Sequence, residues 1–158
     1  MLVISHFIHI QLFVFSDCSI DESSCPGSLG YILNREVCFC YKVYTTKQNY
    51  DSSVKICEND NGELARISNA LRQQALENAL DGISSYAEAY IQGTRTAGST
   101  TWYYNDGTEV TYFNWNTPGG QPQHRDDGED YLLVRKTKGY RWHDVYKAEQ
   151  HIVVCEIE

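Results

Sequence analysis

The sequence has no run of basic residues, and its 13 lysines and arginines are outnumbered by 21 aspartates and glutamates, for a formal charge of −8. Proteins that bind nucleic acid neutralise its phosphates with clustered lysine and arginine side chains. The composition therefore excludes nucleic acid as an expected partner. Long apolar runs are also missing, so no segment of the 158 residues is predicted to span a membrane.

Paired Cys-x-x-Cys units, which are typical of zinc sites, are absent, although the sequence contains six cysteines. Six cysteines in a chain of this size favour an oxidising compartment and disulfide bonds. Four of them lie between residues 18 and 40, whereas Cys57 and Cys155 are far apart in the chain. Spacing alone does not determine which cysteines pair, so the pairing stays open at this point.

The first 16 residues contain no lysine, arginine, aspartate or glutamate and are too short to cross a bilayer. We interpret residues 1–16 as a secretory signal peptide, although the usual positively charged start is missing. The alternative is a truncated or wrongly assigned start. Residues 17–24 are a short polar lead-in, and residues 25–158 are predicted to form one domain with its own core.

Two helices are predicted in the first half of the domain. Asn49 is a suitable cap for a helix with apolar residues at helical spacing from Tyr50 to Cys57, and Asn61-Gly62 is expected to stop it. Ser68 is the predicted cap of a second helix that ends at Asp81-Gly82. Its apolar face is expected to contain Leu71, Ala75, Leu76, Ala79 and Leu80.

The rest of the domain is predicted to consist of strands and loops. Alternating and aromatic residues indicate paired strands in 30–43, and short strands are predicted at 90–93, 131–134 and 152–154. Asn105-Asp106-Gly107 is a hairpin-turn motif between aromatic segments. Two early helices, later strands and cysteines near both ends predict a disulfide-stapled α+β domain.

Residues 114–144 carry most of the loop chemistry in the chain. Two of the three prolines, Pro118 and Pro122, lie here among several glycines, which argues against a helix. A polar loop framed by tryptophans favours an ordered binding segment over a linker. Its side chains are rich in amide and carboxylate oxygens, which are the ligands that calcium prefers.

The order of landmarks over residues 25–158 resembles that of the C-type lectin-like domain family. No single motif is diagnostic, but the collinear set covers most of the chain. The resemblance implies an α+β fold with two helices, short antiparallel sheets and a long ligand-binding loop. In chain order the motifs are Cys40-Tyr41-Lys42, Tyr50 with Cys57, residues 62–68, Asn105-Asp106-Gly107, Asn114-Trp115, Gln121-Pro122-Gln123, Gly128-Glu129-Asp130, Trp142-His143-Asp144 and Val154-Cys155-Glu156.

The resemblance also implies a set of disulfide bonds. Cys57 is expected to pair with Cys155, and Cys25 with Cys40, while Cys38 is a rival partner for Cys25. Cys18 would then pair with the thiol that is left over.

Two departures from the family pattern concern stability. The positions of a usual second disulfide across the long loop are occupied here by Tyr131 and Lys147, so packing or a metal must hold the loop instead. Tyr90 stands where the family usually has a core tryptophan, and its hydroxyl needs a hydrogen-bond partner.

In sugar-binding members of the family, a loop proline in the cis form directs its two neighbours toward a calcium ion that also binds two sugar hydroxyls. Gln121 before Pro122 resembles the variant associated with galactose-type ligands. Gln123 and His143 depart from the usual residues, and an imidazole nitrogen suits zinc or copper better than calcium. The residues that match the calcium- and carbohydrate-binding positions are Gln121, Gln123, Glu129, His143 and Asp144.

Other residues of the stretch allow two interpretations each. Asp126, Asp127 and Asp130 either supply oxygens, for example to a second calcium, or only keep the loop solvated. We favour a hydrogen-bonding role for His143 over a zinc site, because His124 is the only other histidine nearby. Rings at Tyr140 and Trp142 are candidates to face a sugar, although a tryptophan here is more typical of the core.

The resemblance thus predicts a secreted, calcium-dependent lectin that binds carbohydrate or glycoprotein, with weak single sites that a homo-oligomer would strengthen. The second hypothesis is a calcium-independent module of the same fold that binds protein or glycoprotein surfaces. An enzyme is not expected, because no Ser-His-Asp or Cys-His arrangement is evident and the cysteines look structural.

Overall fold

The computed structural model describes residues 18–123 and 128–158. The predicted signal peptide at 1–16 therefore lies outside the described residues. Within the described part, no helix is long and apolar enough to cross a membrane. The predicted α+β class is confirmed, with two α-helices and strands that join into a single sheet.

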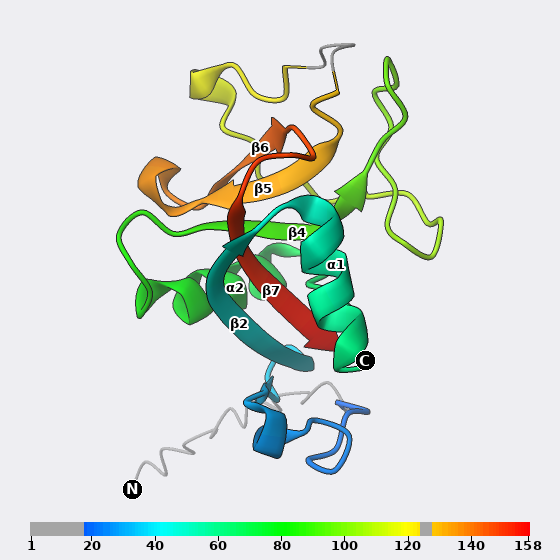
Figure 1. The fold of residues 1–158 in the computed structure, drawn as a ribbon, viewed down its shortest axis with the longest axis vertical. Helices are drawn as coiled ribbons and strands as arrows, with labels where there is room; N and C mark the ends of the chain where they lie inside the picture. Colours follow the sequence, from blue (N-terminus) through cyan, green and yellow to red (C-terminus); the bar gives the residue numbers. More distant parts are fainter. Residues whose placement is uncertain (1–17, 124–127) are drawn as a thin grey trace, which may run out of the picture.

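The sheet has seven strands in the order β1-β2-β7-β4-β5-β6, and β3 pairs with β7 off this path (Figure 1). Every pairing is antiparallel except that of β4 with β7. The last strand therefore lies in the middle of the sheet. The bounds are β1 (Ile32–Asn34), β2 (Phe39–Gln48), β3 (Glu63–Leu64), β4 (Glu88–Thr94), β5 (Tyr131–Arg135), β6 (Arg141–Val145) and β7 (His151–Ile157).

The two helices cover opposite faces of this sheet, with α1 (Tyr50–Asn59) in front and α2 (Ala70–Asp81) behind it in Figure 1. Successive side chains of a strand point to opposite faces. On β7, Ile152 and Val154 belong to the core cluster that contains the buried residues of α2, whereas Val153 belongs to the cluster that contains those of α1. The sheet therefore separates two hydrophobic cores.

Helix α1 follows the sequence prediction. The Asn49 side chain accepts a hydrogen bond from the Ser52 amide at 2.9 Å, which satisfies one of the free donors at the helix start. After the helix, Asn61 is left-handed with φ 59°, and the Gly62 amide donates to the Cys57 carbonyl. A Cβ on residue 62 would lie 2.5 Å from the Glu156 carbonyl oxygen, so only glycine fits there.

Helix α2 is confirmed, with Ala75, Leu76 and Leu80 buried as predicted, but it differs from the prediction at its cap and at part of its buried face. The cap is Asn69, whose side chain accepts from the Arg72 amide, and not Ser68. Leu71 is 68% exposed, while Gln73 is buried. The helix turns Gln73 inward because its Oε1 accepts a hydrogen bond of 2.8 Å from Trp142 Nε1, and a buried indole N–H needs such a partner.

Asn69→Ala is expected to lower the free energy of unfolding by about 1 kcal/mol, because alanine cannot accept the Arg72 amide hydrogen bond. Ser68→Ala is the matched control and should change it by less than about 0.5 kcal/mol, since Ser68 is an exposed surface residue. Urea unfolding of the two variants measures the difference. Equal losses would contradict the assignment of the cap.

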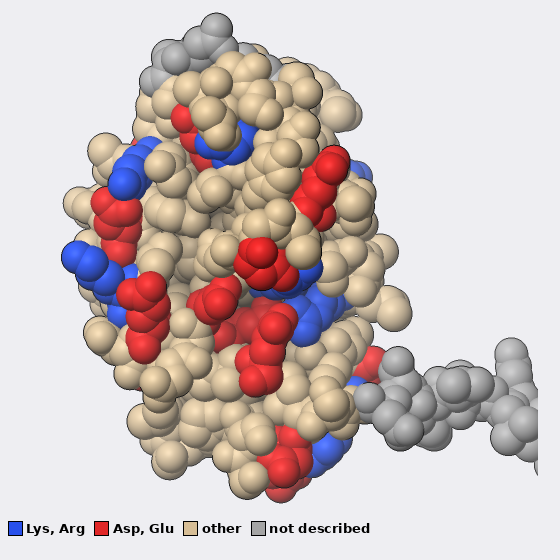
Figure 2. Space-filling model, turned by 90° about the vertical axis from the view of Figure 1, so that its right-hand side faces the viewer, with Lys and Arg blue, Asp and Glu red and all other residues tan. Residues whose placement is uncertain are grey.

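The face of the molecule seen in Figure 2 shows lysine and arginine side chains as separate groups, with acidic side chains beside them. Two ion pairs connect α1 and its C-terminal cap to other segments. Asp51 of α1 lies 2.9 Å from Lys147 in the connection between β6 and β7, and the cap residue Asp60 lies 3.1 Å from Lys42 of β2. No continuous basic patch appears on this face, which agrees with the composition.

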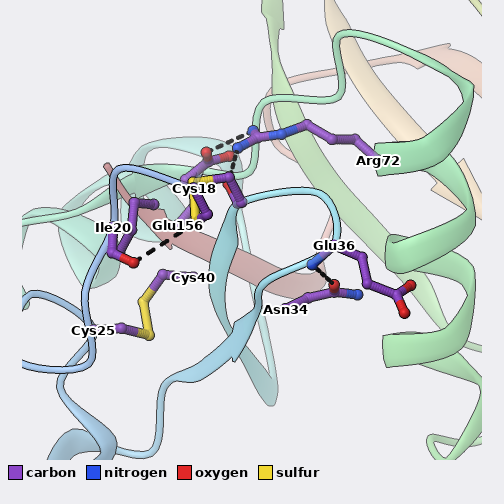
Figure 3. The surroundings of a disulfide bond; sticks show 9 residues. Cys18, Ile20, Cys25, Asn34, Glu36, Cys40, Arg72 and Glu156 are labelled. Atoms are coloured by element: carbon purple, nitrogen blue, oxygen red, sulfur yellow. Dashed lines mark hydrogen bonds and ion pairs between the residues drawn. A yellow bond between two sulfur atoms is a disulfide. The ribbon is translucent and has the colours of Figure 1, made fainter. Parts of the chain in front are cut away.

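Three disulfide bonds join Cys18 to Cys38, Cys25 to Cys40 and Cys57 to Cys155. The last two are the pairs that the resemblance implied, and the rival pairing of Cys25 with Cys38 does not occur. Figure 3 shows Cys18 and the Cys25–Cys40 bridge beside β1 and β2. This N-terminal segment lies at one end of the molecule, and the loop that precedes β5 lies at the other (Figure 1).

The stretch 114–144 is a loop only in its first half. Its second half forms β5, a short 3-10 helix at Lys136–Lys138 and β6. The sequence prediction included part of β5 but not β6, in which the polar His143 and Asp144 are buried. The turn at Asn105-Asp106-Gly107 is confirmed, since the Gly107 amide donates to the Tyr104 carbonyl, although its flanks form isolated bridges and not strands.

Tyr90 and Tyr131 are two of the residues at which the chain departs from the family pattern. Tyr90 is fully buried, and its hydroxyl lies 2.9 Å from the Glu149 carbonyl oxygen, which supplies the required partner. The Tyr131 ring packs on the Tyr50 ring of α1 with centroids 4.3 Å apart. Packing therefore holds β5 where a disulfide is usual in the family.

Candidate functional site

Strand β6 and the segment 114–121 together build the candidate site. The Trp142 amide donates to the Asn114 carbonyl at 2.8 Å, and the Asn116 amide donates to the Trp142 carbonyl at 3.1 Å. The chain then forms a 3-10 turn at Thr117–Gly119, and Gly120 adopts the left-handed conformation. The Gln121 amide donates a hydrogen bond back to the Asn116 carbonyl. This closed turn places Gln121 beside the residues that follow Trp142 on β6.

Asp144 is the centre of the site and is almost fully buried. Its amide donates to Gln121 Oε1 at 3.2 Å. Its carboxylate oxygens accept from the Gln123 amide at 3.0 and 2.9 Å. The peptide bond between Gln121 and Pro122 is cis, as the resemblance led us to expect. The structure thus brings together Gln121, Gln123 and Asp144, three of the five predicted site residues, through direct hydrogen bonds.

His143 points to a different partner. Its Nε2 lies 3.2 Å from the Asn116 side-chain nitrogen, and with that amide as the donor Nε2 is the acceptor. Burial lowers the pKa of His143 to about 4, and the nearby Arg135 guanidinium acts in the same direction. The ring is therefore neutral at pH 7, with the lone pair of Nε2 directed at Asn116.

Glu129 lies at the entry to β5 and is also buried. Its carbonyl oxygen accepts a hydrogen bond of 3.3 Å from Arg95, and the next residue, Asp130, forms an ion pair with Arg95. The carboxylate of Asp130 is therefore engaged by an arginine of the chain itself. Asp126, Asp127 and His124 lie outside the described residues.

Four of the five predicted residues offer the donors that calcium requires. Amide oxygens come from Gln121 and Gln123, and carboxylate oxygens come from Glu129 and Asp144. His143 does not fit, because it offers a nitrogen that already faces Asn116. Among the described residues, no three side chains of histidine, cysteine, aspartate or glutamate converge as a metal-binding group, so the amide oxygens are needed to complete the set.

The two aromatic side chains named as candidates for a sugar contact differ in their burial. Trp142 is fully buried, and its ring packs edge-on against Trp115. The Tyr140 hydroxyl hydrogen-bonds to the carboxylate of Asp81. The core interpretation of Trp142 is therefore confirmed, whereas Tyr140 is half-buried, with its hydroxyl bonded to a protein partner.

Two residues of this region were not singled out from the sequence, namely Asn116 and Arg95. Asn116 is the second asparagine of an Asn-Trp-Asn motif, and nothing in that motif indicates that its side chain reaches His143. Arg95 follows a strand of mixed character, and its partners are 34 and 35 positions further along the chain. Only the tertiary fold reveals either role.

The lectin C-type domain family matches residues 46–157 of this chain. Among characterised proteins, the C-type lectin lectoxin-Lio3 of Erythrolamprus poecilogyrus is 29% identical over 122 residues, which are 75% of this chain and 74% of that protein. The chain and lectoxin-Lio3 therefore align over most of their lengths.

Solved structures share the fold. The C-type lectin CEL-I of Cucumaria echinata has a TM-score of 0.68 at 25% identity, over 76% of this chain and 90% of that one. A calcium-independent type II antifreeze protein has a TM-score of 0.67 at 21% identity, over 80% and 90% of the two chains. The second likeness concerns the fold alone, and it shows that the same architecture occurs in a protein described as calcium-independent.

Proposed function

Because the chain belongs to the lectin C-type domain family, we propose that it is a secreted lectin that binds carbohydrate through a calcium ion beside β6. A fold alone does not determine a ligand, so the proposal depends on the site residues. The residues that would hold the ion are Gln121, Gln123, Glu129 and Asp144.

The observation that carries the proposal is the position of Asp144 between Gln121 and Gln123. Hydrogen bonds from and to Asp144 orient both the Gln121 side chain and the Gln123 backbone. These bonds hold the Gln121 amide oxygen, the Asp144 carboxylate and the Gln123 backbone next to one another before any ligand binds. Such preorganisation reduces the entropic cost of binding.

A calcium ion held by these residues would supply a positive charge that binds the oxygens of two neighbouring sugar hydroxyls. The carboxylates of Glu129 and Asp144 would accept hydrogen bonds from the sugar hydroxyls, while Gln121 would accept or donate a hydrogen bond through its amide. Gln121 before Pro122 favours galactose-type sugars, on the resemblance to that variant of the family. His143, neutral at pH 7, would remain a hydrogen-bonding neighbour of Asn116 and not a metal ligand.

The proposal predicts that Asp144→Asn and Glu129→Gln each weaken calcium-dependent sugar binding by roughly tenfold or more, because each removes an anionic oxygen with little change in shape. Retention on a galactose-bearing matrix, with calcium and with chelator, measures the effect. Glu36→Gln is the matched control, since Glu36 is exposed in the N-terminal segment (Figure 3) and should leave retention unchanged.

The same experiment separates the second candidate, a calcium-independent module that binds protein or glycoprotein surfaces. The contact of His143 with Asn116 favours it, because one of the five expected ligand positions is occupied by a nitrogen with another partner. If the wild-type protein binds its glycoprotein ligand equally well in chelator, and Asp144→Asn binds as well as wild type, this second candidate replaces the first.

Secretion and assembly are part of the same proposal. Three disulfide bonds fit an oxidising compartment, which supports a secreted protein. Carbohydrate or glycoprotein would be the partner. A homo-oligomer would present several weak sites at once and raise the overall avidity without new contacts in any single site.

A further inference from the structure

Arg95 is a buried cation directly after β4. Its side chain is fully inaccessible to solvent, with an exposed fraction of 0%. A charged group that leaves water must be paired and hydrogen-bonded, or the folded state is strongly destabilised. The partners of Arg95 therefore identify the segments that this residue stabilises.

Arg95 contacts the entry to β5 in three ways. Its amide donates to the Asp130 carbonyl at 3.2 Å, its Nη2 donates to the Glu129 carbonyl at 3.3 Å, and its Nε lies 3.1 Å from Asp130 Oδ1. The last contact is a close ion pair and not an aligned hydrogen bond. The backbone and the side chain of Arg95 thus both bind Glu129 and Asp130, the two residues that connect the long loop to the sheet.

The same guanidinium also reaches the turn that follows β4. Its Nη1 donates to the Ser99 carbonyl at 2.8 Å, and its Cζ lies 5.4 Å from the centroid of the Trp102 ring. One cation therefore joins the end of β4, the turn at residues 96–101 and the residues before β5. A planar guanidinium with several donors in fixed directions suits such a junction better than an ammonium group does.

We propose that Arg95 is a positioning residue that acts as a built-in cation and takes the place of a second calcium ion beside Asp130. It neutralises Asp130 and fixes the Glu129 backbone, so residues 128–131 are ordered without any metal. The inference goes beyond the proposed function, because it holds whether or not a sugar binds.

The first test is hydrogen–deuterium exchange of the whole protein in chelator. The amide of Arg95, which donates to the Asp130 carbonyl, should be protected in the wild type and should exchange at least roughly tenfold faster in Arg95→Gln. The melting temperature of Arg95→Gln should fall by roughly 10 °C, as expected for a buried ion pair that loses one partner. Arg35→Gln is the control, because the Arg35–Glu22 pair is exposed and the same charge is removed.

A second measurement distinguishes a cation that replaces calcium from a residue that merely fills space. In Arg95→Gln, added calcium should raise the melting temperature more than it does in the wild type, because Asp130 then lacks its cation. Arg95→Lys keeps the positive charge but loses the planar set of guanidinium donors. Calcium should therefore raise its melting temperature less than that of Arg95→Gln. Equal calcium shifts in wild type and Arg95→Gln would overturn the proposal.

Calcium titration of the wild type and of Arg95→Gln completes the experiment. One additional ion bound by Arg95→Gln agrees with the inference, whereas the same number of ions in both proteins contradicts it. If the wild type binds no calcium, the proposed lectin mechanism fails. The role of Arg95 is then decided by the exchange measurements in chelator, where unchanged protection in Arg95→Gln would refute it.

Discussion

Replacing Cys57 and Cys155 together by alanine should lower the free energy of unfolding by about 4–5 kcal/mol. The bond spans 98 positions of the chain, and in the chain-entropy model a loop of this length contributes about 4.7 kcal/mol by restricting the unfolded state. Both side chains are fully buried between α1 and β7, so alanine is preferable to serine, whose hydroxyl would lack a partner. Few single features of the domain are expected to matter as much.

Guanidinium unfolding of the double variant under non-reducing conditions measures this effect. The matched control is the double replacement of Cys18 and Cys38 by alanine, whose bond spans 20 positions and should contribute about 3 kcal/mol. A loss for the Cys57–Cys155 variant that is smaller than for the control would show that the long crosslink does not act through the unfolded chain.

Arg72→Met should lower the free energy of unfolding by about 3–5 kcal/mol at pH 7, because it leaves a buried carboxylate without its cation. Arg72 Nη1 donates to Glu156 Oε1 at 2.6 Å, and Glu156 is only 2% exposed (Figure 3). Arg72 also donates to the Cys38 carbonyl, which links α2 to the N-terminal segment. Methionine preserves much of the side-chain volume, so the loss reports the charge and its hydrogen bonds.

The loss should be smaller at pH 5 than at pH 7. Burial raises the pKa of Glu156 above its ordinary value, and removing Arg72 raises it further, because Arg72 favours the charged form. A carboxyl whose folded pKa is raised destabilises the fold increasingly as pH rises past its unfolded value, so protonation at pH 5 relieves part of the cost. Arg35→Met, at an exposed ion pair, should change stability by less than about 0.5 kcal/mol at both pH values. A loss for Arg72→Met that does not vary with pH would count against the buried carboxylate as its cause.

The helices show how far local patterns determine this fold. Helix α1 was predictable because its cap, its apolar spacing and its stop motif are all local. Helix α2 was predicted at the right place, and Ala75, Leu76 and Leu80 of its predicted face are buried, but Gln73 and not Leu71 completes that face. Gln73 is buried because Trp142, 69 positions later, needs a hydrogen-bond acceptor, and no local pattern of α2 contains that information.

Strand β6 shows the corresponding limit for the candidate site. Its sequence Arg-Trp-His-Asp-Val has no alternation of apolar and polar residues, because both faces of the strand are buried from Trp142 to Val145. The family resemblance supplied Gln121, Gln123 and Asp144, which the fold brings together. It did not supply Arg95 or Asn116, since their partners are distant in the chain and belong to no motif.

The central place of β7 in the sheet sets an order of events during synthesis. A ribosome makes β2 and β4 long before residues 151–157, yet β7 must lie between these two strands. Until then both strands present unpaired edges, which are prone to associate with other chains. The Cys57 thiol must also wait for Cys155, whereas all four N-terminal cysteines are available once residue 40 has been made. We therefore expect the nascent chain to oxidise its N-terminal segment first and to need chaperone protection until its last strand is inserted.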